Sequence, residues 1–285
     1  VEKVADTSVL NDAQMYAIHL SIMHPSEEGL AALLKKSVNV NLRDGELISP
    51  LHLAAYFGRV QMLRMLLKAQ AEPNIRDNAA RTPAHYVLAT RYLYPGTPAA
   101  ITVDGTPAGQ PLPPRVAILQ ILKNHKASIN EADEAGDTPL ITATRKENAA
   151  AVEWLLSHGA RPDAATRNQE TALHIALANQ DRETARLLVA KGAPLNTPNA
   201  KGEPPLLLAC REGAYRLLEK MLEQDIDVRW VHPKTGETLA HAAAFSGSPR
   251  TMKLLDRRGM EWNVQDTAGY SPVHYAARGG DTDGL

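Results

Sequence analysis

A spacing of 33 residues constrains this chain more than any other feature of its sequence. His19, His52 and His85 are separated by that interval, and so are His241 and His274. Self-similarity at a fixed period of about 20 to 50 residues is typical of repeat architectures, in which each unit packs on its neighbours. The period therefore predicts a solenoid of stacked units and not a single closed core.

Two insertions explain the departures from this period. The interval from His85 to His174 is 89 residues, which is two periods plus 23, and the interval from His174 to His241 is 67, which is two periods plus one. The longer insertion is the Pro- and Gly-rich segment 92–114 inside the third repeat, predicted to be a projecting loop. It is either a tolerated surface loop, since added loop length costs little closure entropy, or a binding or shape-defining element. As a surface loop, it could be deleted without loss of the fold.

Two motifs recur in phase with the period. The first begins at Ser49 as SPLHLAAYFG and recurs as TPAHYVLA, TPLITA, TALHIALA, PPLLLAC, TLAHAAAFSG and SPVHYAARGG. The second recurs as MLLKAQAEPN, ILKNHKASIN, WLLSHGARPD, LLVAKGAPLN and LLDRRGMEWN. They resemble the TPLHxAA and LLxxGADVN signatures of ankyrin repeats over nearly the whole chain. The resemblance implies an all-α ankyrin-repeat solenoid over 1–285, a single domain of about seven full repeats and a terminal half-repeat with short hairpin-like fingers.

Local physical chemistry favours the same unit. Ser or Thr followed by Pro is a helix start, because the hydroxyl accepts a hydrogen bond from a free backbone N–H and proline at the first position loses none. Leu51, Ala54 and Ala55 share one face of the helix that follows, and their small size allows close packing. At the first repeat, Tyr16 and Ala17 replace the Thr-Pro start, as expected of a cap.

The sequence contains no recognisable catalytic constellation. A net charge of −1 gives no global positive field for nucleic acid, and a single cysteine, Cys210, excludes an internal disulfide. No run of 18 apolar residues is present, so direct membrane insertion is not expected. Six in-phase histidines invite a metal hypothesis, but helices one repeat apart lie about 8 to 10 Å apart, too far for one zinc ion. The resemblance instead makes them hydrogen-bonding structural groups, so we predict no catalytic residue, metal or cofactor.

The resemblance implies a protein partner on the concave face, which the fingers and the exposed ends of the first helices form. Aromatic residues and Arg most often anchor such interfaces. The alternative for the aromatic positions is simple packing along the helix row. The candidate protein-binding residues are Tyr56, Phe57, Arg81, Arg145, Lys146, Asn179, Arg211, Glu212, Phe245 and Tyr270.

Two functions remain open, and a third, an enzyme with its site at the insertion, is disfavoured. The first is a non-enzymatic binder, monomeric when free, such as an inhibitor, an adaptor or an immunity-type protein. The second is a targeting or regulatory region excised from a larger enzyme or channel. The first residue, Val1, and an eighth repeat that ends after one helix favour excision. The cytoplasm and the bacterial periplasm are both compatible with the composition.

Overall fold

Each repeat opens with a short helix whose start is set by its first residues. In the second repeat, the Ser49 side chain accepts a hydrogen bond from the backbone N–H of His52, and Pro50 is the first residue of the helix. Proline costs nothing there because that N–H has no partner within a helix. The helices therefore begin where the motif predicts.

The computed structural model describes residues 16–89, 99–104, 111–224 and 226–279. In these residues helices occur as seven pairs followed by α15, and β structure is limited to three isolated bridges. The helices are α1 (Ala17–Met23), α2 (Glu27–Lys35), α3 (Pro50–Tyr56), α4 (Val60–Lys68), α5 (Pro83–Leu88), α6 (Pro114–Asn124), α7 (Pro139–Arg145), α8 (Ala149–Ser157), α9 (Ala172–Ala178), α10 (Arg182–Ala190), α11 (Pro205–Arg211), α12 (Tyr215–Met221), α13 (Leu239–Phe245), α14 (Pro249–Asp256) and α15 (Pro272–Gly279). The predicted all-α solenoid of seven repeats and a half-repeat is confirmed.

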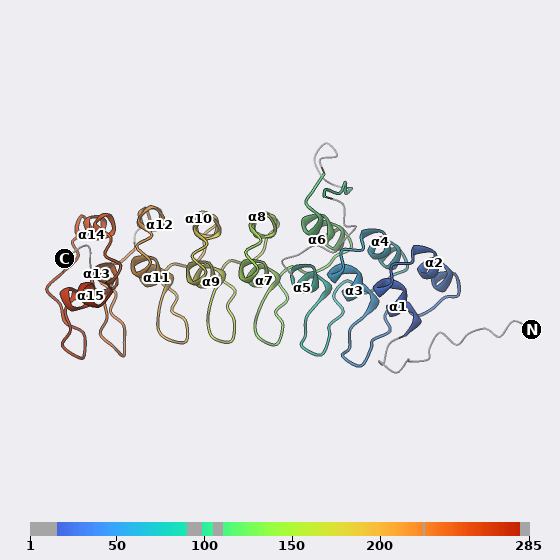
Figure 1. Ribbon diagram of the computed structural model, residues 1–285, viewed down its shortest axis with the longest axis horizontal. Helices are drawn as coiled ribbons and strands as arrows, with labels where there is room; N and C mark the ends of the chain where they lie inside the picture. Colours follow the sequence, from blue (N-terminus) through green and yellow to red (C-terminus); the bar gives the residue numbers. More distant parts are fainter. Residues whose placement is uncertain (1–15, 90–98, 105–110, 225, 280–285) are drawn as a thin grey trace, which may run out of the picture. The chain divides into compact units, whose positions relative to one another are not determined.

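The chain divides into two compact units, 1–160 and 161–285. In each unit the first helices of successive repeats form one row, the second helices form another, and the fingers project from the first row (Figure 1). Within each unit, small buried alanines at the same position of the first helices allow close packing: Ala54 and Ala143 in the first unit, and Ala176, Ala209 and Ala243 in the second. The single domain over 1–285 stays a prediction.

None of the helices in the described ranges has the length and apolar character that crossing a bilayer requires.

The described part of the insertion differs from the projecting surface loop that we predicted. An antiparallel bridge joins Ile101 to Leu112, and the side chains of Ile101 and Val103 are only 8% and 4% exposed. Arg64 of α4 donates a hydrogen bond to the Thr102 carbonyl at 2.9 Å, so this part packs beside the second helices. The insertion also ends at residue 113, since Pro114 already belongs to α6. Residues 92–98 and 105–110, with Tyr92 and Tyr94, lie outside the described residues.

This packing changes the expected result of mutating the insertion. Ile101→Ala is expected to lower the free energy of unfolding by about 2 kcal/mol, because a buried aliphatic group leaves a cavity. Thr102→Ala, at the exposed position between the two buried ones, is the matched control and should change stability by less than about 0.5 kcal/mol. Urea denaturation measures both values. Equal stabilities for the two variants would restore the surface-loop interpretation.

Candidate protein-binding site

The fingers are held in place by the in-phase histidines. His52 accepts a hydrogen bond at Nδ1 from the backbone N–H of Ser49 at 3.1 Å, and its Nε2 lies 3.0 Å from the carbonyl oxygen of Arg81 in the next finger. A carbonyl only accepts hydrogen bonds, so Nε2 carries the proton and Nδ1 does not. The neutral ring thus joins the start of one helix to the base of the following finger.

The Nε2 bond to the next finger recurs in both units. His19, His174 and His241 reach the carbonyls of Ile48, Glu203 and Tyr270, each 29 residues ahead. His85 reaches the carbonyl of Asp137, 52 residues ahead, because the insertion lies between them. The predicted structural role of these histidines is therefore confirmed.

Burial sets the ionisation of these imidazoles. It lowers the pKa of His52 to about 4, and the hydrogen bond to the Arg81 carbonyl only partly opposes it. Burial also lowers the pKa of His19, His85 and His174. In the part of the chain that the structure describes, no group of His, Cys, Asp and Glu side chains could hold a metal ion.

A second periodic position shapes the finger turns, and our sequence analysis missed it. Asp77 Oδ1 accepts hydrogen bonds from the backbone N–H groups of Ala79 and Arg81, which closes the turn. The equivalent residues, which also accept two backbone N–H groups, are Asp44, Asp133, Thr166, Asn199, His232 and Asp266. The signal was present, since four of the seven are Asp in phase with the histidines.

An aromatic and ionic cluster occupies the finger side of the first unit. Tyr86 donates a hydrogen bond to Asp77 Oδ2 at 2.8 Å, and Arg81 Nε donates to the same oxygen at 2.8 Å. The ring of Tyr56 meets Tyr86 edge-on at 6.2 Å, and the neighbouring Phe57 at 5.2 Å. This brings together three predicted residues, Tyr56, Phe57 and Arg81, around Tyr86, which the sequence analysis did not select.

The cluster keeps its charges despite burial. Burial alone would raise the pKa of Asp77, but the hydrogen bonds from Tyr86 and Arg81 outweigh it and hold that pKa below the ordinary value. Burial and the bond to Asp77 raise the pKa of Tyr86.

In the next repeat, Arg145 donates two hydrogen bonds to the Asp137 carboxylate, at 2.8 and 3.3 Å. Lys146, the next residue, is half-buried.

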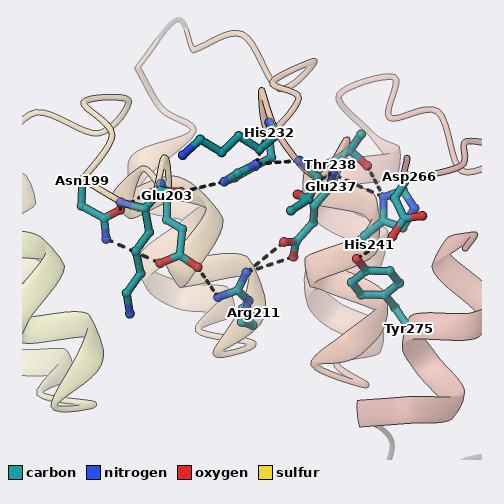
Figure 2. Close-up of polar contacts among 12 residues, drawn as sticks. Asn199, Glu203, Arg211, His232, Glu237, Thr238, His241, Asp266 and Tyr275 are labelled. Carbon is teal, nitrogen blue, oxygen red and sulfur yellow. Dashed lines mark hydrogen bonds and ion pairs between the residues drawn. The ribbon is translucent and has the colours of Figure 1, made fainter. Parts of the chain in front are cut away.

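In the second unit, one guanidinium joins two repeats. Figure 2 shows Arg211 of α11 between Glu203 of its own finger, at 2.8 Å, and Glu237 of the next finger, at 3.0 Å to both oxygens. The Arg211 side chain is 31% exposed, while those of Glu203 and Glu237 are 17% and 11% exposed. Burial opposes the ionised form of Glu203, but the bonds from Arg211 prevail and lower its pKa. Arg211 was predicted to contact a partner, but its position between two carboxylates was not predicted.

The last finger carries the most exposed aromatic of the predicted set. Tyr270 is 51% exposed, and its backbone carbonyl accepts the bond from His241. In the same repeat, Tyr275 donates a hydrogen bond to Asp266 at 3.0 Å (Figure 2). Phe245 is half-buried because the chain at Gly279 passes so close that an added Cβ would lie 2.5 Å from its ring.

The other predicted residues do not join these clusters. Asn179 is the exposed residue that ends α9, and Glu212 is exposed at the end of α11. Cys210 is fully buried, and burial raises the pKa of its thiol. A buried thiol with a raised pKa has the properties of a structural side chain.

Known proteins with similar sequences carry the same repeats. Family profiles described as ankyrin repeats match residues 33–87, 115–200, 162–232 and 206–285. The human transient receptor potential cation channel subfamily A member 1 is 29% identical over 54% of the chain, and the mouse B-cell lymphoma 3 protein homolog is 32% identical over 53%. The chain spans only 15% of the channel and 35% of the mouse protein.

A solved structure shares the architecture. The crystal structure of the ankyrin repeat domain of Bcl-3, described as a unique member of the IkappaB protein family, aligns with a TM-score of 0.67. The alignment covers 85% of this chain and 98% of that one at 20% identity, which shows the fold alone. The chain belongs to the ankyrin-repeat family, whose fold generally serves as a non-catalytic protein-interaction module.

Proposed function

We propose that the chain binds a protein partner through its finger surface and performs no catalysis. In the second unit this surface consists of Lys201, Glu203, Arg211, Glu212, Glu237, Phe245 and Tyr270. The observation that carries the proposal is the Arg211 clamp. Two carboxylates from different repeats fix the guanidinium, yet the Arg211 side chain stays 31% exposed. Side chains held in one conformation lose little entropy on binding, which favours an interface.

The residue types agree with this use. Tyr270 and Arg211 belong to the two classes that most often carry binding energy, and carboxylates of the same surface give it both signs of charge. In the first unit, Tyr56, Phe57, Arg81 and Arg145 would extend the same kind of contact. Because Tyr56 and Phe57 are half-buried in an aromatic cluster, alanine there would change stability as well as affinity.

The role could be that of an inhibitor or adaptor, or of a targeting region in a longer protein. The sequence likeness to the mouse B-cell lymphoma 3 protein homolog is compatible with the first of these roles. The small share of the channel that the chain spans supports a targeting region. Affinity capture from the native extract, followed by mass spectrometry, tests the proposal when wild type and a finger-surface variant are compared. A partner retained equally by both would contradict it.

The sharpest variant for this comparison is Tyr270→Ala. Its ring is half exposed, so the melting temperature should change little, whereas affinity for the captured partner should fall by about 2 kcal/mol, the scale of an interface hot spot. Val273→Ala is the matched control, because Val273 is 73% exposed but lies on α15 and not in a finger. Isothermal titration with the captured partner measures both affinities. Equal affinities of the two variants would place the contact elsewhere.

A further inference from the structure

A cavity with an unusual charge lies on the second helices of the second unit. It has a volume of about 400 Å³ and is lined by arginines from three repeats. Arg182 and Arg186 come from α10, one helical turn apart, Arg216 comes from α12, and Arg250 comes from α14. The ring of Tyr215 forms part of the wall, and α12 packs against both α10 and α14. The row of these three helices is visible in Figure 1.

The fold does not neutralise these charges. All four arginines are exposed, and none of them forms an ion pair with a carboxylate in the described residues. Arg250 instead lies over the Tyr215 ring, with its guanidinium carbon 5.6 Å from the ring centre. In contrast, Arg211 on the first-helix row is bound by two carboxylates. Arg182 and Arg186 lie one helical turn apart on α10, and like charges at that spacing are unfavourable for stability, so the fold does not explain their grouping.

The four arginines that line the cavity are suited to binding an anion with several oxygens. All four cationic groups are arginines, whose planar fork binds the oxygens of a phosphate or carboxylate in pairs. A phosphate monoester carries a charge of about −1.5 to −2 at neutral pH and three acceptor oxygens, more than a carboxylate offers. The volume is within the range of about 300 to 1,000 Å³ that is usual for small ligand sites. We propose that this cavity binds a phosphoserine or phosphothreonine side chain of a protein segment.

The surroundings favour a compact dianion over an extended anionic surface. Glu183 and Glu219 are exposed on the same helices, α10 and α12, close in sequence to the arginines. A flat anionic bilayer or a nucleic-acid backbone would meet these carboxylates together with the arginines. A single phosphate seated in the cavity would meet mainly the guanidinium groups. This site is separate from the finger surface, so its test does not depend on the partner proposed there.

The test uses the full chain and a fluorescein-labelled Gly-Gly-Ser-Gly-Gly peptide in three forms, with serine, phosphoserine or glutamate at its centre. Fluorescence anisotropy should show that the phosphorylated form binds roughly tenfold more tightly than the other two. Inorganic phosphate should displace it. Equal binding of the three forms, or no binding of the phosphorylated one, would overturn the proposal.

Paired variants identify the residues. Arg182→Gln with Arg216→Gln should weaken binding of the phosphorylated peptide roughly tenfold, since two charge-assisted contacts are lost. Arg167→Gln with Arg257→Gln removes the same charge from exposed positions outside the cavity and should leave binding within about twofold. Equal losses in both pairs would indicate only general charge attraction. Arginine-dependent binding to phosphatidylcholine–phosphatidylserine vesicles, without binding of the phosphorylated peptide, would assign the cavity to a membrane surface and reject the proposal.

Discussion

Lowering the pH from 7 to 5 is expected to destabilise the folded repeats well before their carboxylates are protonated. The pKa of His52 is about 4 in the folded chain and about 6.5 when unfolded, so only the unfolded state gains a proton between those values. The folded state therefore loses about 1.4 kcal/mol of stability per pH unit below 6.5, or about 3 kcal/mol by pH 4, from this residue alone. His19, His85 and His174 add to the loss in the same direction. Urea denaturation at a series of pH values measures the slope.

Two variants distinguish the contribution of His52 to the pH dependence of stability from that of other groups that gain protons. His52→Gln should be less stable than wild type at pH 7, because the hydrogen bonds at Ser49 and at the Arg81 carbonyl are lost. Its stability should fall less steeply between pH 6.5 and 5. His125→Gln removes an exposed imidazole and is the control. A slope equal to that of wild type in His52→Gln would show that this ring does not set the acid response.

Replacing Arg211 by Met is expected to cost about 3 kcal/mol of folding free energy at pH 7. Methionine retains an unbranched apolar stem but leaves Glu203 and Glu237, both largely buried, without their shared cation. Removing one partner of a buried pair costs about 3 to 5 kcal/mol, and the partial exposure of Arg211 places the loss at the lower end. Thermal and urea denaturation measure the change.

A second substitution tests whether unpaired charge causes the loss of stability in Arg211→Met. Adding Glu237→Gln to Arg211→Met removes one of the two stranded carboxylates and should recover part of the stability. Arg145→Met is a comparison variant in the first unit, where the arginine that pairs with Asp137 is 41% exposed, so its cost should be below about 1 kcal/mol. A double variant no more stable than Arg211→Met would mean that packing, and not charge, causes the loss.

The fold could be predicted from the sequence because its signals are local and repeated. Ser49 and Pro50 start a helix through their own backbone geometry, and the same pair recurs in phase along the chain. The histidine role followed from the resemblance. The partner atom of His85 did not, because it lies 52 residues ahead across the insertion.

The candidate site was predicted only in part, because side-chain pairing depends on contacts between repeats. Arg211 and Tyr270 were selected as an arginine and an aromatic residue of the expected concave face, but nothing local indicates that Glu237, 26 residues later, binds Arg211. Tyr86 was not selected, yet its hydroxyl donates a hydrogen bond to Asp77. Ile101 and Val103 were hidden by the Pro and Gly around them, although their alternation with Thr102 is typical of extended chain that buries one side.

Extra sequence between the two helices of a repeat does not disturb the hydrogen bond to the next repeat. Residues 92–113 enter between the two helices of one repeat, and the bond from His85 Nε2 to the Asp137 carbonyl forms at 2.9 Å despite the longer path along the chain. The hydrogen bond between neighbouring repeats therefore depends on where its two atoms lie and not on the number of residues between them. A graft at this junction would therefore leave the fingers in register, and new sequence could be added to the second-helix side without rebuilding the surface that the fingers form.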